Sequence, residues 1–226
     1  MSVDANSLPG GSYASRRRRM VEEQIRRRGI HDAEVLAAMQ RVPREKFVPE
    51  AVRHQAYCDW PLPIGLGQTI SQPYTVAFMA ASLQLRGDER VLEIGTGSGY
   101  GAAVLSQLAQ VVHTVERLAS LAEQARMRLA ETGCTNVIVH LGDGTQGLPE
   151  HAPFDAIVVT AAARVLPEPY REQLADGGRI VIPIGGRTSQ SLTRFTRHGN
   201  RMTREHLGGF AFVPLIGECG WSESAS

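Results

Sequence analysis

Residues 91–100, which read Val-Leu-Glu-Ile-Gly-Thr-Gly-Ser-Gly-Tyr, place a glycine-rich loop between a predicted strand and a predicted helix. Glycines let the backbone approach a ligand closely, and the first amides of a helix have no partner within it. In an open α/β sheet, such a loop is where a nucleotide-like ligand binds. The glycines alone leave the ligand open, because the dinucleotide pattern G-x-G-x-x-A also fits from Gly97 to Ala102. The loop itself consists of Gly95, Thr96, Gly97, Ser98 and Gly99.

Acidic residues at three successive strand ends narrow the choice of ligand. Glu93 lies inside the first predicted strand, and a carboxylate buried there needs a partner. Glu116 ends the second strand, where an acid can hold ribose hydroxyls. Asp143 and Gly144 follow the third strand, where an acid can accept a hydrogen bond from an adenine amino group. This pattern resembles the class I S-adenosylmethionine-dependent methyltransferases. Their cofactor is a sulfonium, which an acidic crevice attracts, whereas the pyrophosphate of NAD would be repelled.

Motifs outside the glycine loop carry a closer resemblance. The segment Gly67-Gln-Thr-Ile-Ser-Gln-Pro-Tyr74 is similar to the signature of protein-L-isoaspartate O-methyltransferases, and the likeness extends over residues 18–221. The other segments that carry it are Val42–Phe47, Asp155–Ile157, Thr160–Ala163, Pro167, Leu174–Arg179 and Phe212–Leu215. Two departures concern the acceptor wall: Gln72 stands where some members have Ala, and Tyr74 where some have His.

The resemblance implies a reaction and a set of site residues. The enzyme would esterify the free α-carboxylate of L-isoaspartyl residues in damaged proteins with S-adenosylmethionine, leave S-adenosylhomocysteine, and so begin repair through a succinimide. Ser71 would lie at the active site, near the acceptor carboxylate and the methyl donor. Its position two residues before Pro73 also fits a helix N-cap, and one hydroxyl can serve both roles. The damaged segment is expected along residues 57–74 and 212–215. The residues assigned to substrate binding are Thr69, Ile70, Gln72, Val213, Pro214 and Leu215.

The implied chemistry needs alignment of the reactants rather than a base. The free α-carboxyl of an isoaspartyl residue has a pKa of about 3.3–3.7, so it is already ionised at pH 7. Positioning alone can supply about 7–11 kcal/mol of the barrier. We therefore expect His54, His113 and His140 to be structural or surface residues, and we expect no metal.

Two other functions stay open on the sequence alone. A class I methyltransferase could act on a small molecule or on RNA instead of a protein. The arginines at 16–19 and 26–28 could also serve a non-catalytic nucleic-acid binder. Acidic residues between Glu22 and Glu45 favour a solvated helix face for this segment instead.

The elements that must position these residues alternate between short Val/Ile/Leu runs and amphipathic helices. Such alternation indicates βαβ units and a mainly parallel sheet. Strands are expected over 90–95, 111–116, 137–142, 155–160 and 178–184, and helices over 18–28, 32–39, 76–85, 100–109, 118–131 and 167–175. Gly29 is expected to end the first of these helices and Asp32 to cap the second. Two β-like runs, 190–196 and 207–213, should add an antiparallel edge. The predicted fold class is a doubly wound, Rossmann-like α/β domain with an N-terminal helical and loop addition.

The composition agrees with one globular domain: 42% of the 226 residues are hydrophobic and 21% are charged. We expect a disordered start over 1–17 and a single domain over 18–226, divided into the addition (18–72) and the cofactor-binding core (73–226). The net charge of +1 gives no general attraction to nucleic acid or membranes. The three cysteines fit no metal spacing, which predicts reduced thiols in the cytoplasm. We expect no secretory signal, no membrane segment and a monomer.

Overall fold

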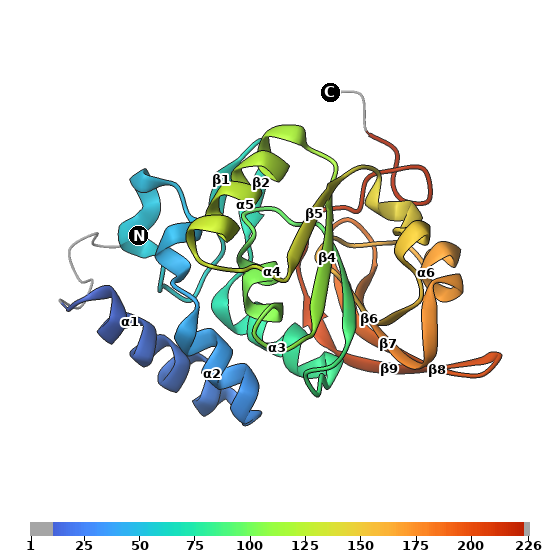
Figure 1. Ribbon diagram of the computed structural model, residues 1–226, viewed down its shortest axis with the longest axis horizontal. Coiled ribbons are helices and arrows are strands. Elements are labelled where there is room, and N and C mark those ends of the chain that lie inside the picture. Colours follow the sequence, from blue (N-terminus) through green and yellow to red (C-terminus); the bar gives the residue numbers. More distant parts are fainter. Residues whose placement is uncertain (1–10, 224–226) are drawn as a thin grey trace.

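A seven-stranded sheet forms the centre of the computed structural model, which describes residues 11–223 (Figure 1). Its strand order is β5-β4-β3-β6-β7-β8-β9, and the strands from β5 to β7 are mutually parallel. Strands β8 and β9 pair antiparallel at one edge. The prediction of a doubly wound, mainly parallel sheet with an antiparallel edge is confirmed. The strands are β3 (Arg90–Ile94), β4 (Val111–Glu116), β5 (Val137–Leu141), β6 (Phe154–Val159), β7 (Leu174–Gly185), β8 (Gln190–His198) and β9 (Arg201–Phe210).

Successive residues of each strand point to opposite faces of the sheet and pack into two apolar clusters, one on each face. Val91 and Val158 pack into the cluster that holds helices α3, α4 and α5, whereas Leu92 and Ile157 pack into the cluster that holds Tyr170 of α6. Because both faces of these strands are buried, most residues along them are apolar. The helices are α3 (Pro73–Leu83), α4 (Tyr100–Leu105), α5 (Ala119–Glu131) and α6 (Glu168–Glu172).

The N-terminal addition lies to one side of the sheet (blue in Figure 1). Helix α1 (Tyr13–Met20) begins at Ser12, whose hydroxyl accepts from the Ser15 amide, and continues through a π-helical stretch at 21–25 and a 3-10 turn at 26–28. The expected disordered start therefore does not extend to residue 17; residues 1–10 lie outside the described part. Gly29 ends the helix with a φ of 95°, as predicted.

Helix α2 (Ala33–Arg41) confirms the predicted cap at Asp32, whose carboxylate accepts from the Val35 amide at 3.0 Å. The next segment joins the addition to the core. Arg44 is fully buried, donates to the Ala56 carbonyl at 2.7 Å, and places its guanidinium 4.9 Å from the ring centre of Tyr100, the first residue of α4. This stacking fixes the position of the helix that follows the glycine loop.

Residues 41–70, expected to be irregular, contain two 3-10 turns (Arg44–Phe47 and Glu50–Gln55) and a small hairpin. Strands β1 (Leu62–Gly65) and β2 (Gln68–Ile70) pair antiparallel around a turn in which Gly65 and Leu66 have positive φ. The hairpin brings Thr69 and Ile70, at the end of β2, beside the loop that follows β3.

The last strand differs from its expected range. Strand β9 starts at Arg201 instead of 207, because a two-residue turn at Gly199 and Asn200 pairs Arg201 directly with His198. Gly199 takes the positive φ that such a turn requires. Residues 211–213 leave the sheet and return toward β6.

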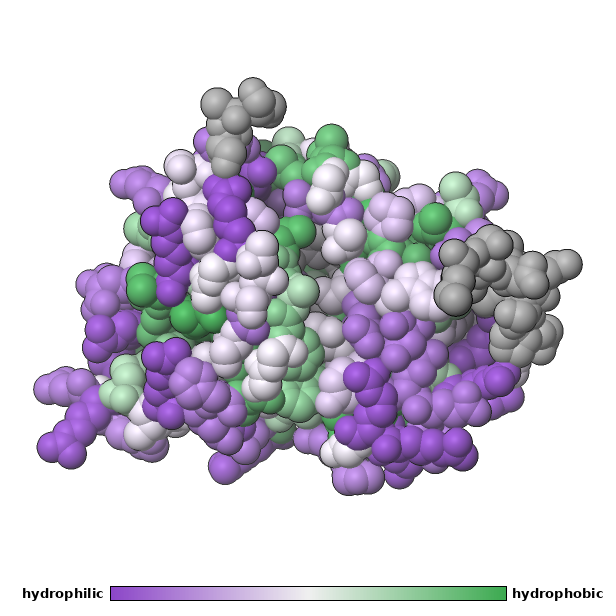
Figure 2. All heavy atoms as spheres, turned by 180° about the vertical axis from the view of Figure 1, so that it is seen from behind, coloured by the Kyte–Doolittle hydropathy of each residue, from purple (hydrophilic) through white to green (hydrophobic). Residues whose placement is uncertain are grey.

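Apolar side chains gather in the middle of the face seen in Figure 2, with hydrophilic side chains toward its edges. Within residues 11–223, the helices are too short or too polar to cross a lipid bilayer.

Candidate active site

The glycine loop lies at the carboxyl end of β3, between that strand and β6, where the direction of the strand order reverses. Gly95, Gly97 and Gly99 all have positive φ, which a residue with a side chain would adopt only under strain. A Cβ at Gly95 would lie 2.3 Å from the Thr160 hydroxyl, which donates to the carbonyl of Gly95 at 2.8 Å. The loop is therefore held against the end of β6, as an open α/β sheet requires for ligand binding at its switch point.

Glu93 is buried behind this loop, with 1% of its surface exposed. The hydroxyl of Thr114 donates to its carboxyl at 2.6 Å, and Thr96 and Thr114 share a further hydrogen bond of 2.6 Å. Burial raises the pKa of Glu93 to about 8; the Thr114 hydrogen bond opposes this rise and the Glu116 charge adds to it. The partner predicted for Glu93 is thus a threonine hydroxyl, and the acid is mostly protonated at pH 7. A Cβ at Gly101 would lie 2.3 Å from the same carboxyl, so residue 101 must be glycine for Glu93 to fit.

Glu116 ends β4 and lines the same pocket. Its carboxylate accepts from the amide of Gly97 at 2.9 Å and from the amide of Leu118 at 3.0 Å. These two bonds join the glycine loop to the first turn of α5. With Glu93 beside it, the pocket presents two carboxyl groups to a ligand, while the guanidinium of Arg117 pairs with Glu223 at 2.7 Å. A cationic ligand without phosphate suits this lining.

Asp143 takes a different place from the one expected, since it does not line the pocket. Its carboxylate accepts from the amide and hydroxyl of Thr145, at 2.9 and 2.7 Å, and from the amide of Glu218 at 2.8 Å. Burial works against the charge, but these hydrogen bonds hold the pKa of Asp143 below its usual range. The neighbouring Gly144 does line the pocket, and a Cβ there would lie 2.7 Å from Ile94.

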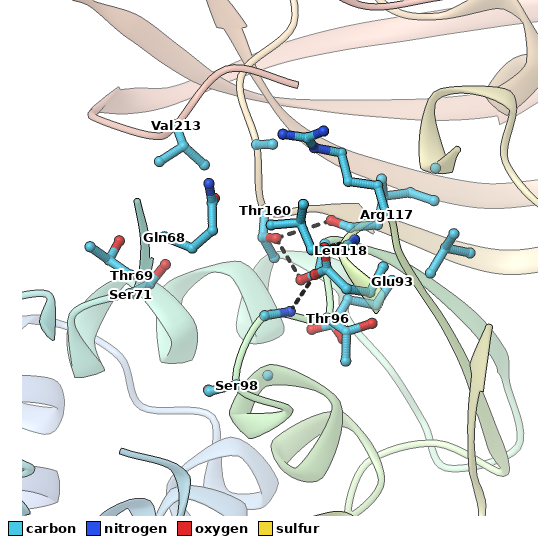
Figure 3. Close-up of a pocket in the computed structure, with 18 of the residues that line it drawn as sticks. Gln68, Thr69, Ser71, Glu93, Thr96, Ser98, Arg117, Leu118, Thr160 and Val213 are labelled. Atoms are coloured by element: carbon cyan, nitrogen blue, oxygen red, sulfur yellow. Dashed lines mark hydrogen bonds between the residues drawn. The ribbon is translucent and has the colours of Figure 1, made fainter. Parts of the chain in front are cut away.

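Ser71 lies across the pocket from Glu93 (Figure 3). Helix α3 begins at Pro73 with Gln72 at its N-cap, and no side chain makes the capping hydrogen bond. The alternative of Ser71 as the helix cap is therefore wrong, and its hydroxyl is not committed to the helix end. The predicted site residues that line the pocket are Thr69, Ile70, Ser71, Glu93, Gly95, Thr96, Gly97, Ser98, Glu116, Gly144, Val213, Pro214 and Leu215.

A second groove adjoins the pocket on the side of the N-terminal addition. Gln72 lies in this groove, and its side-chain amide donates to the carboxylate of Asp59 at 2.9 Å. Asp59 also forms an ion pair with Arg28 at 2.9 Å. The guanidinium of Arg28 lies 3.7 Å from the ring centre of Tyr74. Phe78 and Phe210 are in contact nearby, with ring centres 5.3 Å apart and ring planes tilted by 36°. The residues that line the groove are Arg28, Pro61, Thr69, Ser71, Gln72, Tyr74, Thr75, Phe78, Thr160 and 207–213.

The pocket and the groove share Thr69, Ser71, Thr160 and Val213. Val213 is held there because its carbonyl accepts from the amide of Ala162 at 2.7 Å, which ties the returning chain to the end of β6. A ligand in the pocket and an extended chain in the groove would thus meet beside the Ser71 hydroxyl.

Sequence reasoning missed several lining residues. Gln68, Arg117, Leu118 and Thr160 line the pocket, and Arg28 and Phe78 line the groove. Thr160 opens the segment 160–163, already noted as part of the family resemblance, so its signal was present. Arg28 comes from an element far away in the sequence and offers no such signal.

Comparison with known proteins decides the family. The family model described as protein-L-isoaspartate(D-aspartate) O-methyltransferase (PCMT) matches residues 15–220. The chain belongs to this family. A protein-L-isoaspartate O-methyltransferase of Syntrophotalea carbinolica is 57% identical over 212 residues, covering 93% of this chain and 98% of the relative. A protein-L-isoaspartate O-methyltransferase 2 of Pelobacter propionicus is 56% identical over 221 residues, covering 97% of both.

Solved structures of family members have the same fold. One protein-L-isoaspartate O-methyltransferase superposes with a TM-score of 0.79 at 30% identity, covering 89% of this chain and 66% of that one. A putative family enzyme from Plasmodium falciparum, solved with S-adenosyl-L-homocysteine, has a TM-score of 0.76 at 27% identity and covers 88% and 98%. The predicted family and fold class are confirmed.

Proposed function

We propose that this family member transfers the methyl group of S-adenosylmethionine to the free α-carboxylate of L-isoaspartyl residues in damaged proteins. The observation that carries the proposal is the junction of a carboxyl-lined pocket with an open groove at Thr69, Ser71, Thr160 and Val213. A bisubstrate methyl transfer needs two such sites that meet at one point. Esterification turns a carboxylate oxygen into a methoxy group that can leave, so the next backbone nitrogen can attack the ester carbonyl, release methanol and close the succinimide that begins repair.

The residues around the pocket suit S-adenosylmethionine. The loop from Gly95 to Gly99 would cradle the methionyl part. Glu116 would supply negative potential and hold the ribose, whereas Glu93 is mostly protonated at pH 7 and would support the loop from behind. When bound, the cofactor supplies an electrophilic methyl group on a sulfonium. Asp143 would act near the adenine through the segment it fixes, since Gly144 and Ile216 line the pocket beside it.

Ser71 is proposed to position the acceptor carboxylate. The acceptor is ionised at pH 7, so no group has to remove a proton. A hydroxyl that donates to one carboxylate oxygen leaves the other oxygen free to attack along the line of the methyl–sulfur bond. Such alignment is worth about 7–11 kcal/mol in well-oriented reactions.

The damaged segment is proposed to lie extended in the groove, between the end of β2 with Gln72 and the returning segment 211–215. Phe78, Phe210 and Tyr74 give an apolar floor for neighbouring side chains. The amide of Phe212 is already occupied by the buried side chain of Gln190 at 2.9 Å, which holds this wall in place.

Methyl transfer to matched peptides tests the proposal. Two peptides that differ only in an isoaspartyl or an aspartyl linkage are incubated with radiolabelled S-adenosylmethionine and the full chain. We expect base-labile label on the isoaspartyl peptide and background label on its twin. Equal label on both, or label on RNA or small metabolites with none on the isoaspartyl peptide, would overturn the proposed acceptor.

The arginines of the N-terminal segment support a protein-directed function over nucleic-acid binding. Arg19 pairs with Glu23 and Arg26 with Glu22, both at 3.0 Å, and Arg28 pairs with Asp59.

We further propose that the enzyme acts as a monomer in the cytoplasm, where its three free cysteines stay reduced. Light scattering and cell fractionation measure these two properties.

A further inference from the structure

Three histidines converge at the β5 edge of the sheet. His113 lies in the middle of β4, His140 near the end of β5, and His151 in the 3-10 turn that precedes β6. One nitrogen from each ring lies within 4.8 Å of the others. The three histidines belong to three different elements, so their spacing in the sequence does not predict that they lie together.

We propose that His113, His140 and His151 form a binding site for a divalent transition metal ion of the zinc class, with the fourth position open to water. Imidazole is the preferred ligand of Zn²⁺, Ni²⁺, Cu²⁺ and Co²⁺, and three histidines with a water is a common zinc environment. None of the three histidines lines the pocket or the groove described above.

The geometry of the first pair is close to that of a formed site. In tetrahedral zinc with bonds of about 2.0–2.1 Å, two ligand nitrogens lie about 3.3 Å apart. Nδ1 of His113 and Nε2 of His140 are already 3.1 Å apart and share one proton. When the metal binds, the donor ring would carry its proton on its other nitrogen, so the pair loses one hydrogen bond and gains two metal bonds while both rings stay neutral. The ligand nitrogen of His151 lies within 4.8 Å of the other two and would have to approach them to about 3.3 Å, a movement that its place in a short turn allows.

The surroundings allow an ion to enter and favour neutral ligands. His113 is buried against Phe154, whereas His140 and His151 are half-buried and open to solvent. Burial, with the two neighbouring imidazoles, lowers the pKa of His113 to about 4, so the ring is neutral at pH 7, as a ligand must be. The charged groups that act on the cluster are Arg90, Arg126 and Glu150. Two cations against one anion would weaken the binding of a metal cation relative to a neutral surrounding.

A metal here would add one link shared by three elements, β4, β5 and the turn that ends at His151. Strand β5 is an edge strand, and the turn with His151 is tied to the sheet through its carbonyl, which accepts from Arg90 at 3.0 Å. The role is structural: the ion would hold β5 and this turn onto β4, the strand that ends at Glu116 in the cofactor pocket.

Metal titration of the full chain, first freed of metal with a chelator, tests the site. We expect one Zn²⁺ per chain by calorimetry, and Co²⁺ to give visible d–d bands without the near-ultraviolet band that a cysteine ligand adds. At free Zn²⁺ about 100 times the dissociation constant, the midpoint of thermal unfolding should rise by about 5–10 °C.

Variants at the half-buried ligands locate the binding. His140→Gln and His151→Gln should each weaken Zn²⁺ binding by at least about 100-fold, more than loss of a supporting residue does. His198→Gln, at an exposed histidine of the β8–β9 turn, is the matched control and should bind as the parent does. Cys219→Ser controls for the exposed thiol.

No stoichiometric binding to the parent, or equal binding by His151→Gln and the parent, would overturn the proposal. Because the variants retain buried His113, they should fold; circular dichroism and methyl transfer without metal establish that they do.

Discussion

Glu93→Gln should make the protein more stable than the parent at alkaline pH and leave its stability unchanged in acid. Glu93 is fully buried beneath the glycine loop and keeps its proton up to a pH of about 8, whereas the same side chain in the unfolded chain ionises near 4.5. Between these values, folding takes up a proton at this site. The free energy of unfolding of the parent therefore falls as pH rises, by about 1.4 kcal/mol for each pH unit.

The sign and the size follow from the two pKa values. Below pH 4.5 both states are protonated and Glu93 adds no pH dependence. From 4.5 to about 8 the loss accumulates to several kcal/mol, and above 8 it is constant, because both states are then ionised. Glutamine keeps the shape and still accepts from the Thr114 hydroxyl, but it has no proton to lose.

Urea unfolding of both proteins between pH 4 and 9, without cofactor, measures the difference. The gap in unfolding free energy should open steadily from pH 5 and level off above pH 8. Glu172→Gln, at an exposed glutamate, is the control and should differ from the parent by less than about 0.5 kcal/mol throughout. A gap that does not change with pH, or a parent more stable than Glu93→Gln at pH 9, would refute the reasoning.

Three further outcomes are expected. Ser71→Ala should lower single-turnover methyl transfer by at least tenfold, yet change the free energy of unfolding by less than about 0.5 kcal/mol because the Ser71 hydroxyl caps no helix. Ser120→Ala, at a surface serine, is the control, and a fully active Ser71→Ala would exclude the positioning role. Glu116→Ala should weaken cofactor binding by about 1–3 kcal/mol in calorimetry, through loss of charge-assisted hydrogen bonds, and unchanged affinity would remove Glu116 from the site. The rate at saturating substrates should show no acidic limb between pH 6 and 7, since the acceptor is already ionised; a titration near 6.5 would point to a histidine base.

Local signals predicted most of the core. Strand β4 has the predicted bounds, 111–116, because a Val-rich run ends at a charged residue, and the cap at Asp32 follows from a single side chain. Strand ends are harder where turns decide them. The Gly199–Asn200 turn starts β9 six residues early, and the β1–β2 hairpin lies in a proline-rich stretch whose strands are too short for a periodic pattern.

The sequence predicted those site residues whose position depends on a single strand and the loop that follows it. Gly95 to Gly99 and Glu116 sit where strand-end reasoning puts them, since parallel strands bring their carboxyl ends to one edge. Asp143 also lies at that edge, but its carboxylate accepts a hydrogen bond from the amide of Glu218, 75 positions later in the chain, and so does not face the pocket. The partner of Glu93, the cluster around His113, and the groove residue Arg28 all depend on such long-range contacts, which sequence periodicity does not encode.

The anchoring of the returning chain has a consequence for the order in which the enzyme becomes active during synthesis. Val213 to Ile216 form one wall of the pocket, and Trp221 holds that wall: its amide donates to the Leu215 carbonyl at 2.7 Å and its indole to the Ala162 carbonyl at 2.9 Å. A domain generally folds as a unit, so its last segment is needed before the site is complete. The sheet ends at Phe210, eleven residues before Trp221, so a chain that stops between these two positions contains every strand but lacks the anchor of the last wall. A polypeptide terminated ahead of Trp221 would have the sheet and the glycine loop without a closed cofactor site, so truncated products would not compete for the methyl donor.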